Sequence, residues 1–207
     1  MGRRSLLFWD LMAKKYSGQA IADEASYAKK LEVTQTYFRP DSDVMEFGCG
    51  TGSTAMVHAP HVRHILATDG SAKMITIAKG KAAAQHIENI TFECTTITAL
   101  ELPRESKDAV LGLSILHLVD DRDAVIQKVY AMLKPGGVFV TSTICMGDSL
   151  KLTLIARLIA PFGWLVGLVL RVFTMEELKA SMVRAGFKID HEWRPGPDKA
   201  AFIIAKK

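Results

Sequence analysis

The stretch EFGCGTGS, residues 46–53, follows the apolar pair Val44 and Met45 and holds three glycines in five positions. Glycine adopts left-handed backbone conformations without steric cost and lets another group approach the main chain closely. A glycine-rich turn directly after the first strand of a parallel sheet is typical of a ligand site at the carboxyl edge of that sheet. This stretch therefore predicts both the fold class and the place of the site.

Short apolar runs alternate with helical stretches on either side of this turn. Such alternation predicts βαβ units and a parallel sheet that is covered by helices on both faces. The motif LKPGG at 133–137 indicates a helix end followed by a strand start. We expect strands at 43–47, 64–69, 90–94, 108–114 and 137–143, and helices at 53–58, 71–85 and 121–133.

The two ends of the chain are expected to complete a single domain over residues 1–207. Residues 5–38 have a helical pattern and precede the first strand, so they cannot be a crossover. We expect them to form a helical cap, within 1–39, over the carboxyl edge of the sheet or on one face. Residues 187–193 and 200–205 are expected to form a closing hairpin around the turn RPGPD.

The composition is that of a globular protein: 49% of the residues are hydrophobic, 23% are charged, and the net charge is +4. No run of Lys or Arg exceeds two residues, and this argues against a nucleic-acid partner. Cys49, Cys94 and Cys145 lie far apart, which argues against a disulfide framework and against a metal site. Asp10 interrupts the apolar run near the N-terminus, so we expect no secretion signal and a cytoplasmic protein.

The spacing of the glycines separates two kinds of ligand. A dinucleotide site has the pattern G-x-G-x-x-G, but Ser53 stands where its third glycine would be. Glu46 would repel a pyrophosphate, whereas it would attract an ammonium group. Asp69 ends the second predicted strand and can accept hydrogen bonds from both hydroxyls of a ribose. Asp69 alone fits NAD equally well, but together with Glu46 it favours a nucleoside that carries an amino-acid tail.

Four ordered motifs resemble those of the class I S-adenosylmethionine-dependent methyltransferases. They are EFGCGTG, TDGSAKM, DAVLGLSILHLVDD and LKPGGVFV, between residues 46 and 140. The resemblance is to the members of this family that methylate small molecules such as quinones and lipids. It implies a Rossmann-like α/β fold whose seven-stranded, mostly parallel sheet ends in an antiparallel hairpin. It also implies S-adenosylmethionine as the cofactor.

The resemblance further implies roles for individual residues. The loop of Gly48, Cys49, Gly50 and Gly52 would carry the methionine portion and the ribose against its backbone. Glu46 would orient the amino end of the cofactor. The ribose hydroxyls would be held by Asp69, the adenine would lie beside Gly70 and Met74, and the methionine tail would contact Leu113 and Ser114.

The sequence departs from the family at the adenine site. Family members often carry an aspartate after the third strand, and this chain has Thr96 there. A hydroxyl still accepts a hydrogen bond, but it carries no charge. We expect Thr96 and the neighbouring backbone, including Ile97, to contact the adenine.

Three residues are candidates for the chemistry at the acceptor. His117 follows the fourth predicted strand, and imidazole titrates near neutral pH, so it is the best candidate for a general base. The alternative is a histidine that packs beneath the cofactor or caps the next helix. Tyr16 and Tyr27 are expected to line the pocket and orient the substrate, with ordinary burial as the alternative.

Residues 152–170, LTLIARLIAPFGWLVGLVL, carry one charge in a length close to that of a membrane span. Arg157, Pro161 and Gly163 argue against spanning. The segment either covers a hydrophobic edge of the core or forms an apolar lid over the active site, and weak contact with a membrane surface is a further possibility. We expect a lid-like insertion at 148–175.

Taken together, these features predict methyl transfer from S-adenosylmethionine to a small apolar acceptor, such as a quinone-like ring, a lipid or a secondary metabolite. Two alternatives remain at this point. One is an NAD(P)-dependent oxidoreductase, which Glu46 and Ser53 disfavour. The other is a catalytically silent partner subunit that keeps the methyltransferase fold.

Overall fold

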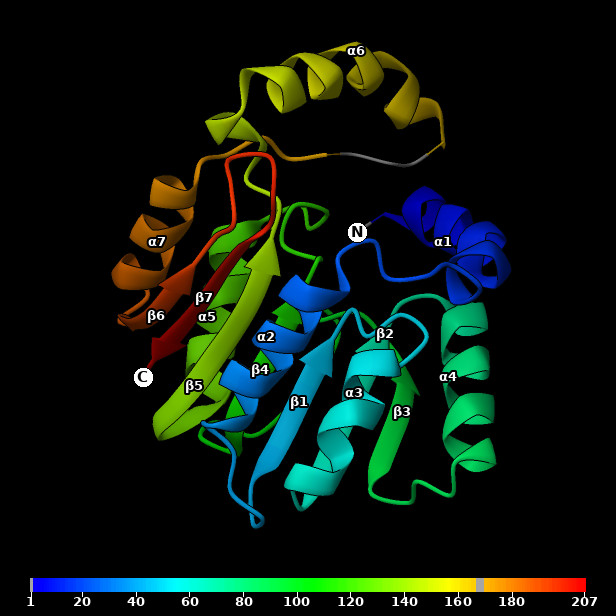
Figure 1. Cartoon of the computed structure of the whole chain (residues 1–207), viewed down its shortest axis with the longest axis vertical. Helices are drawn as coiled ribbons and strands as arrows, with labels where there is room; N and C mark the ends of the chain where they lie inside the picture. Colours follow the sequence, from blue (N-terminus) through cyan, green and yellow to red (C-terminus); the bar gives the residue numbers. More distant parts are fainter. Residues whose placement is uncertain (1, 167–169) are drawn as a thin grey trace.

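The computed structural model describes residues 2–166 and 170–207, and within them the strands form one seven-stranded sheet (Figure 1). The strand order is β3-β2-β1-β4-β5-β7-β6. The first five strands in the chain are parallel, whereas β7 runs antiparallel to both β5 and β6. This confirms the predicted fold class. The strands are β1 (Asp43–Phe47), β2 (His64–Asp69), β3 (Ile90–Cys94), β4 (Lys107–Leu113), β5 (Leu133–Thr143), β6 (Lys188–Trp193) and β7 (Ala201–Lys206).

Helices cover both faces of the sheet, and each face has its own apolar cluster. One cluster joins Val44 and Ile65 of the sheet to the helices α2, α3 and α4. The other joins Met45 and Phe139 to α5 and α7. Since neighbouring residues of a strand point to opposite faces, both faces are apolar, as expected of a buried parallel sheet. The helices are α1 (Arg3–Ser17), α2 (Glu24–Gln35), α3 (Ser53–His58), α4 (Ala72–Ala84), α5 (Arg122–Met132), α6 (Leu150–Val166) and α7 (Met175–Arg184), with short 3₁₀ turns at Ala59–His61 and Met146–Asp148.

The amino edge of the sheet is held together by the carboxylate of Asp108. Its Oδ2 accepts hydrogen bonds from the backbone N–H of Asp43, at 2.8 Å, and from Nζ of Lys134, at 2.7 Å. Its Oδ1 accepts from Nη2 of Arg39 at 3.1 Å. The side chain of Asp108 is largely buried, so these charge-assisted bonds join β1, β4 and β5 at the end of the sheet opposite the glycine loop.

Apart from shifts of one residue at several ends, the structure differs from what the sequence pattern indicates in three places. The strand β5 begins at Leu133 and not at residue 137, because Leu133 pairs with Lys107 on β4 across a shift in register. The helical stretch 5–38 is divided into α1 and α2 near Gly18. Finally, α6 continues as one helix through Pro161. Residues 167–169 of the predicted lid lie outside the described residues.

The two parts of the N-terminal segment lie in different places. Figure 1 shows α1 beside the end of α4, at the end of the sheet toward which β1 and β2 point, and α2 in front of the sheet. The helix α6 lies beyond the same end of the sheet and contacts α1. None of the described helices combines the length and the hydropathy that crossing a bilayer requires.

Candidate active site

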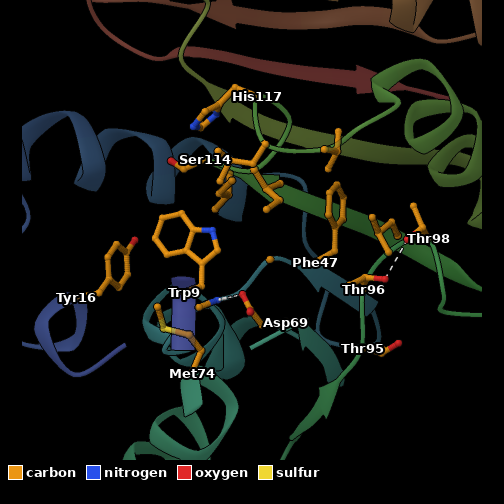
Figure 2. Close-up of a pocket in the computed structure, with 18 of the residues that line it drawn as sticks. Trp9, Tyr16, Phe47, Asp69, Met74, Thr95, Thr96, Thr98, Ser114 and His117 are labelled. Atoms are coloured by element: carbon orange, nitrogen blue, oxygen red, sulfur yellow. Dashed lines mark hydrogen bonds between the residues drawn. The ribbon is translucent and has the colours of Figure 1, made fainter. Parts of the chain in front are cut away.

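A cavity of about 450 Å³ opens at the carboxyl edge of the sheet (Figure 2). Its walls come from the loop after β1, from the ends of β2 and β4, from the segment after β3, and from α1. Much of the wall is apolar, with contributions from Phe47, Ile115, Val119 and Ile144. The polar groups come from several elements, with Asp69 at the end of β2, Thr96 and Thr98 after β3, and Ser114 and His117 after β4. This arrangement suits a ligand with one polar end and an acceptor with an apolar body.

The glycine loop supports the cavity from below. Gly48, Gly50 and Gly52 have φ angles of 67°, 54° and 75°, in the left-handed region that favours glycine. Gly48 and Gly50 line the cavity, so their backbone is open to a ligand. Gly52 faces the core instead, where a Cβ atom would stand 2.8 Å from Phe92. The loop is fixed from the side by Cys49, whose N–H donates to the carbonyl of Thr68 at 3.0 Å.

Asp69 reaches the cavity from the tip of β2. Its Oδ2 accepts from the N–H of Gly50 at 2.9 Å, and its Oδ1 accepts from the N–H of Ser71 at 2.8 Å. These two bonds fix the carboxylate between the glycine loop and the start of α4, and Figure 2 shows Asp69 at the edge of the cavity. Each oxygen keeps a second lone pair, so the group can accept from two further hydroxyls. Burial raises the pKa of Asp69 despite the two N–H donors.

Glu46 lies beneath the loop and not in the cavity wall. Only 3% of the residue is exposed, and its Oε2 has no hydrogen-bond partner among the described residues. Burial, followed by repulsion from Asp69, raises the pKa of the Glu46 carboxyl to about 8. A cationic group in the cavity above the loop would stabilise the ionised carboxylate by charge attraction. The site therefore fits the ammonium end of an amino-acid ligand.

Helix α1 closes one side of the cavity, and its part was not predicted in detail from the sequence. Trp9 and Tyr16 line the cavity, and the buried indole N–H of Trp9 has no partner among the described residues. Figure 2 shows the indole between Met74 and Ser114. Asp10 fixes the helix, because its Oδ1 accepts from Oγ of Ser71 at 2.5 Å and from the N–H of Lys73 at 3.1 Å.

The remaining predicted cofactor residues surround the same cavity. Thr96 donates to or accepts from Oγ1 of Thr98 at 3.0 Å, so its hydroxyl is already engaged. Ser114 has a φ angle of 55°, which is unusual for a residue other than glycine and marks a strained turn after β4. The lining includes Gly70, Met74, Thr96, Ile97, Leu113 and Ser114, whereas Glu46, Cys49 and Gly52 stand behind it. Their individual roles toward a cofactor stay predictions.

The three candidates for acceptor chemistry are in different surroundings. His117 lines the cavity, its Nδ1 has no partner among the described residues, and burial lowers its pKa to about 4, so the ring is neutral at pH 7. The pKa of Tyr16 is raised by burial and by Asp69 and Glu46. Tyr27 is not among the lining residues; its hydroxyl bonds with Oγ1 of Thr54 at 3.1 Å, and burial raises its pKa.

These pKa shifts define what the three groups can do. A neutral imidazole with a free ring nitrogen can bind or accept a proton, although a pKa near 4 makes it a weak base. Both phenols stay protonated near neutral pH, so they can donate hydrogen bonds but do not act as bases. The catalytic roles of His117, Tyr16 and Tyr27 stay predictions.

Comparison with known proteins identifies the framework that carries this cavity. Residues 44–137, from β1 into β5, match the family described as "Methyltransferase domain". The resemblance to class I S-adenosylmethionine-dependent methyltransferases is confirmed. The matched range contains the glycine loop, Asp69 and His117, while α1 and α6 lie outside it.

Two curated relatives and one solved structure illustrate the similarity. The chain is 35% identical, over 49% of its length, to the ubiquinone biosynthesis O-methyltransferase of Bradyrhizobium sp. (strain ORS 278), covering 39% of that protein. It is 26% identical, over 79% of its length, to the arsenite methyltransferase of Halobacterium salinarum, covering 41% of it. An S-adenosylmethionine-dependent methyltransferase from Mesorhizobium loti superposes with a TM-score of 0.69 at 23% identity, covering 85% of this chain and 96% of the other. The chain thus spans about two fifths of the length of these curated relatives.

Proposed function

We propose that the protein transfers a methyl group from S-adenosylmethionine to a small apolar acceptor, of the quinone-like, lipid or secondary-metabolite class. The observation that carries the proposal is that the glycine loop and Asp69 border a cavity whose wall is largely apolar. The family match and the structural neighbours support S-adenosylmethionine as the cofactor.

The residues around the glycine loop fit this cofactor. Gly48 and Gly50 leave their backbone open to it, and Asp69 has lone pairs for the ribose hydroxyls. Glu46, buried behind the glycine loop, would attract the ammonium group of its methionine portion. When bound, the cofactor supplies an activated methyl group on a sulfonium centre. The tasks left to the chain are to place the acceptor in line with that group and to exclude water.

The apolar part of the cavity wall favours an organic acceptor. Phe47, Ile115 and Leu118 line it, and Leu170 borders it beyond α6. A metalloid acceptor such as arsenite would need converging thiolates. However, the described residues contain no group of three His, Cys, Asp or Glu side chains that could hold a metal ion. Burial also raises the pKa of the Cys49 and Cys145 thiols, which keeps both protonated at neutral pH.

Calorimetric titration with S-adenosylmethionine and with NADH tests the cofactor. We expect the sulfonium nucleoside to bind and NADH not to bind. Asp69→Ala removes charge-assisted bonds of about 1.5–3 kcal/mol each, so it should weaken binding at least tenfold. Asp41→Ala is the matched control, because Asp41 is exposed and pairs only with Arg39 among the described residues.

Each outcome of this titration has a clear meaning. Binding of NADH alone would replace the proposal with an oxidoreductase. Binding of S-adenosylmethionine without turnover of any phenol, quinol or lipid would favour a catalytically silent partner subunit. Methylation of an apolar phenol or quinol, followed by mass spectrometry, would support the proposed acceptor class.

A further inference from the structure

Two helices outside the matched domain expose rows of leucine and isoleucine. On α6, Leu154 and Leu158 are 55% and 78% exposed, and Leu150, Ile155 and Ile159 are exposed beside them. On α1, Leu7 and Leu11 are 56% and 77% exposed. Residues four apart lie on the same side of a helix, so each helix carries a continuous apolar row on its outer side. We call these seven side chains the α1–α6 surface.

The exposed charged side chains around this surface are positively charged. Lys14 and Lys15 end α1, while Lys151 and Arg157 stand on α6, and all four are exposed. Residues 149–171 contain no Asp or Glu. The one acid of α1, Asp10, is turned inward to Ser71 and Lys73. Among the described residues, no carboxylate forms an ion pair with any of these four cations.

Exposed apolar rows bordered by Lys and Arg are the pattern of helices that lie in the interface of an anionic membrane. The leucines enter the acyl boundary, while the long basic side chains reach the lipid phosphates. A second copy of this chain fits less well. An isologous contact would bring the same cations of both copies together. Charge complementarity therefore favours lipid phosphate.

The α1–α6 surface also adjoins the candidate active site. The two helices contact each other at the carboxyl edge of the sheet (Figure 1). Trp9 and Tyr16 of α1 line the cavity on the inner side, while Leu7 and Leu11 point outward from the same helix. Leu170, close beyond the end of α6, lines the cavity as well. Helix α1 thus carries part of the outer apolar rows and lines the cavity, and it contacts α6.

We propose that the α1–α6 surface docks onto a lipid bilayer with anionic headgroups and that an apolar acceptor reaches the cavity from that bilayer. The docking rests on the exposed rows and the charges alone. The delivery of the acceptor rests additionally on the proposed function. The two parts can fail separately, since vesicle binding needs neither cofactor nor acceptor.

Co-sedimentation with vesicles tests the docking. The probes are vesicles of phosphatidylcholine alone and of phosphatidylcholine mixed with phosphatidylglycerol. We expect binding to the mixed vesicles, weakened by salt, and binding at least about tenfold weaker to the neutral ones. The double variant L154Q/L158Q should lower binding to the mixed vesicles by at least about tenfold. The double variant K14Q/K15Q should lower binding to the mixed, anionic vesicles and leave binding to the neutral vesicles unchanged.

Matched controls change the same kinds of side chain elsewhere. Val57→Gln on α3 and Val183→Gln on α7 replace exposed apolar residues away from the α1–α6 surface, and Lys79→Gln removes an exposed cation from α4. These variants should bind like wild type. All variants are checked for a wild-type melting temperature and for binding of S-adenosylmethionine.

Three results would overturn the docking. The first is wild-type protein that binds neither kind of vesicle. The second is L154Q/L158Q protein that is folded and binds as tightly as wild type. The third is a stable dimer, seen by analytical ultracentrifugation, that the same double variant separates, since the surface would then be an interface between copies. Failure of methyl transfer alone would overturn the proposed function and leave the docking intact.

Discussion

Glu46 makes cofactor binding dependent on pH in a direction that the structure defines. Burial and Asp69 raise the pKa of the Glu46 carboxyl to about 8, so the free protein holds a proton there at neutral pH. An ammonium group bound in the cavity above the glycine loop would stabilise the ionised carboxylate by charge attraction. Binding of S-adenosylmethionine is therefore expected to release this proton. Its affinity should rise with pH until the pH reaches about 8.

The size of the effect follows from the same pKa. At pH 6.5 the carboxyl is about 97% protonated when its pKa is about 8. If the bound cation returns the pKa to its ordinary value of 4.5, nearly one proton leaves for each ligand bound. Affinity should then increase about tenfold between pH 6 and pH 7. The α-amino group of the ligand titrates near pH 8, so it stays charged at pH 6.5.

Calorimetric titrations at pH 6.5, in two buffers with different enthalpies of ionisation, count the released protons. Glu46→Gln keeps the shape of the side chain and cannot ionise, so it should release none. Methylthioadenosine lacks the ammonium group, and its binding to wild type should also release none. Equal proton release by wild type and Glu46→Gln would refute the reasoning.

Three further predictions concern stability and the position of α1. Gly52→Ala should lower the free energy of unfolding in urea by about 1–3 kcal/mol, because Gly52 has a φ of 75° and is packed against the core. Gly80→Ala should raise it by up to about 1 kcal/mol, because Gly80 lies on α4 with open space around it. His117 has a pKa near 4 in the folded protein and 6.5 in the unfolded chain, so the unfolded chain binds more protons as the pH falls. This difference should lower the free energy of unfolding of wild type by about 2 kcal/mol between pH 7 and pH 5. In urea unfolding at the two pH values, the decrease should be smaller by that amount for His117→Gln. Asp10→Asn weakens the attachment of α1 to α4, so limited trypsin digestion should cut at the lysines of α1 several-fold faster; an unchanged rate would show that other contacts hold the helix.

The framework of the sheet could be predicted from the sequence because its signals are local. Buried parallel strands such as β1, β2 and β3 are short apolar runs between turns, and their predicted bounds agree with the structure. The start of β5 was missed, since Leu133 is drawn into the sheet by its pairing with Lys107 on another strand. Nor could the continuation of α6 through Pro161 be predicted, because proline normally ends a helix.

The candidate site also has one part that could be predicted from the sequence and one part that could not. The glycine loop and Asp69 have fixed places after β1 and β2, so their convergence follows from the parallel topology. Trp9 and Asp10 could not be assigned, because their positions depend on how α1 packs against α4. The sequence FWD holds a bulky apolar residue next to an acid, but this pair does not show which surface they meet. Similarly, the low pKa of His117 depends on its burial, which no spacing of residues indicates.

The bonds made by Asp108 have a consequence for the order in which the chain folds. Strands β1, β2 and β3 pair among themselves within residues 43–94, over short separations. Adding β4 beside β1 closes a loop of 65 residues between Asp43 and Asp108, and such closure is slow because its entropic cost comes before any contact forms. The bonds from Asp43 and Arg39 to Asp108 can form only after that closure. We therefore expect these two bonds to slow unfolding more than they speed folding.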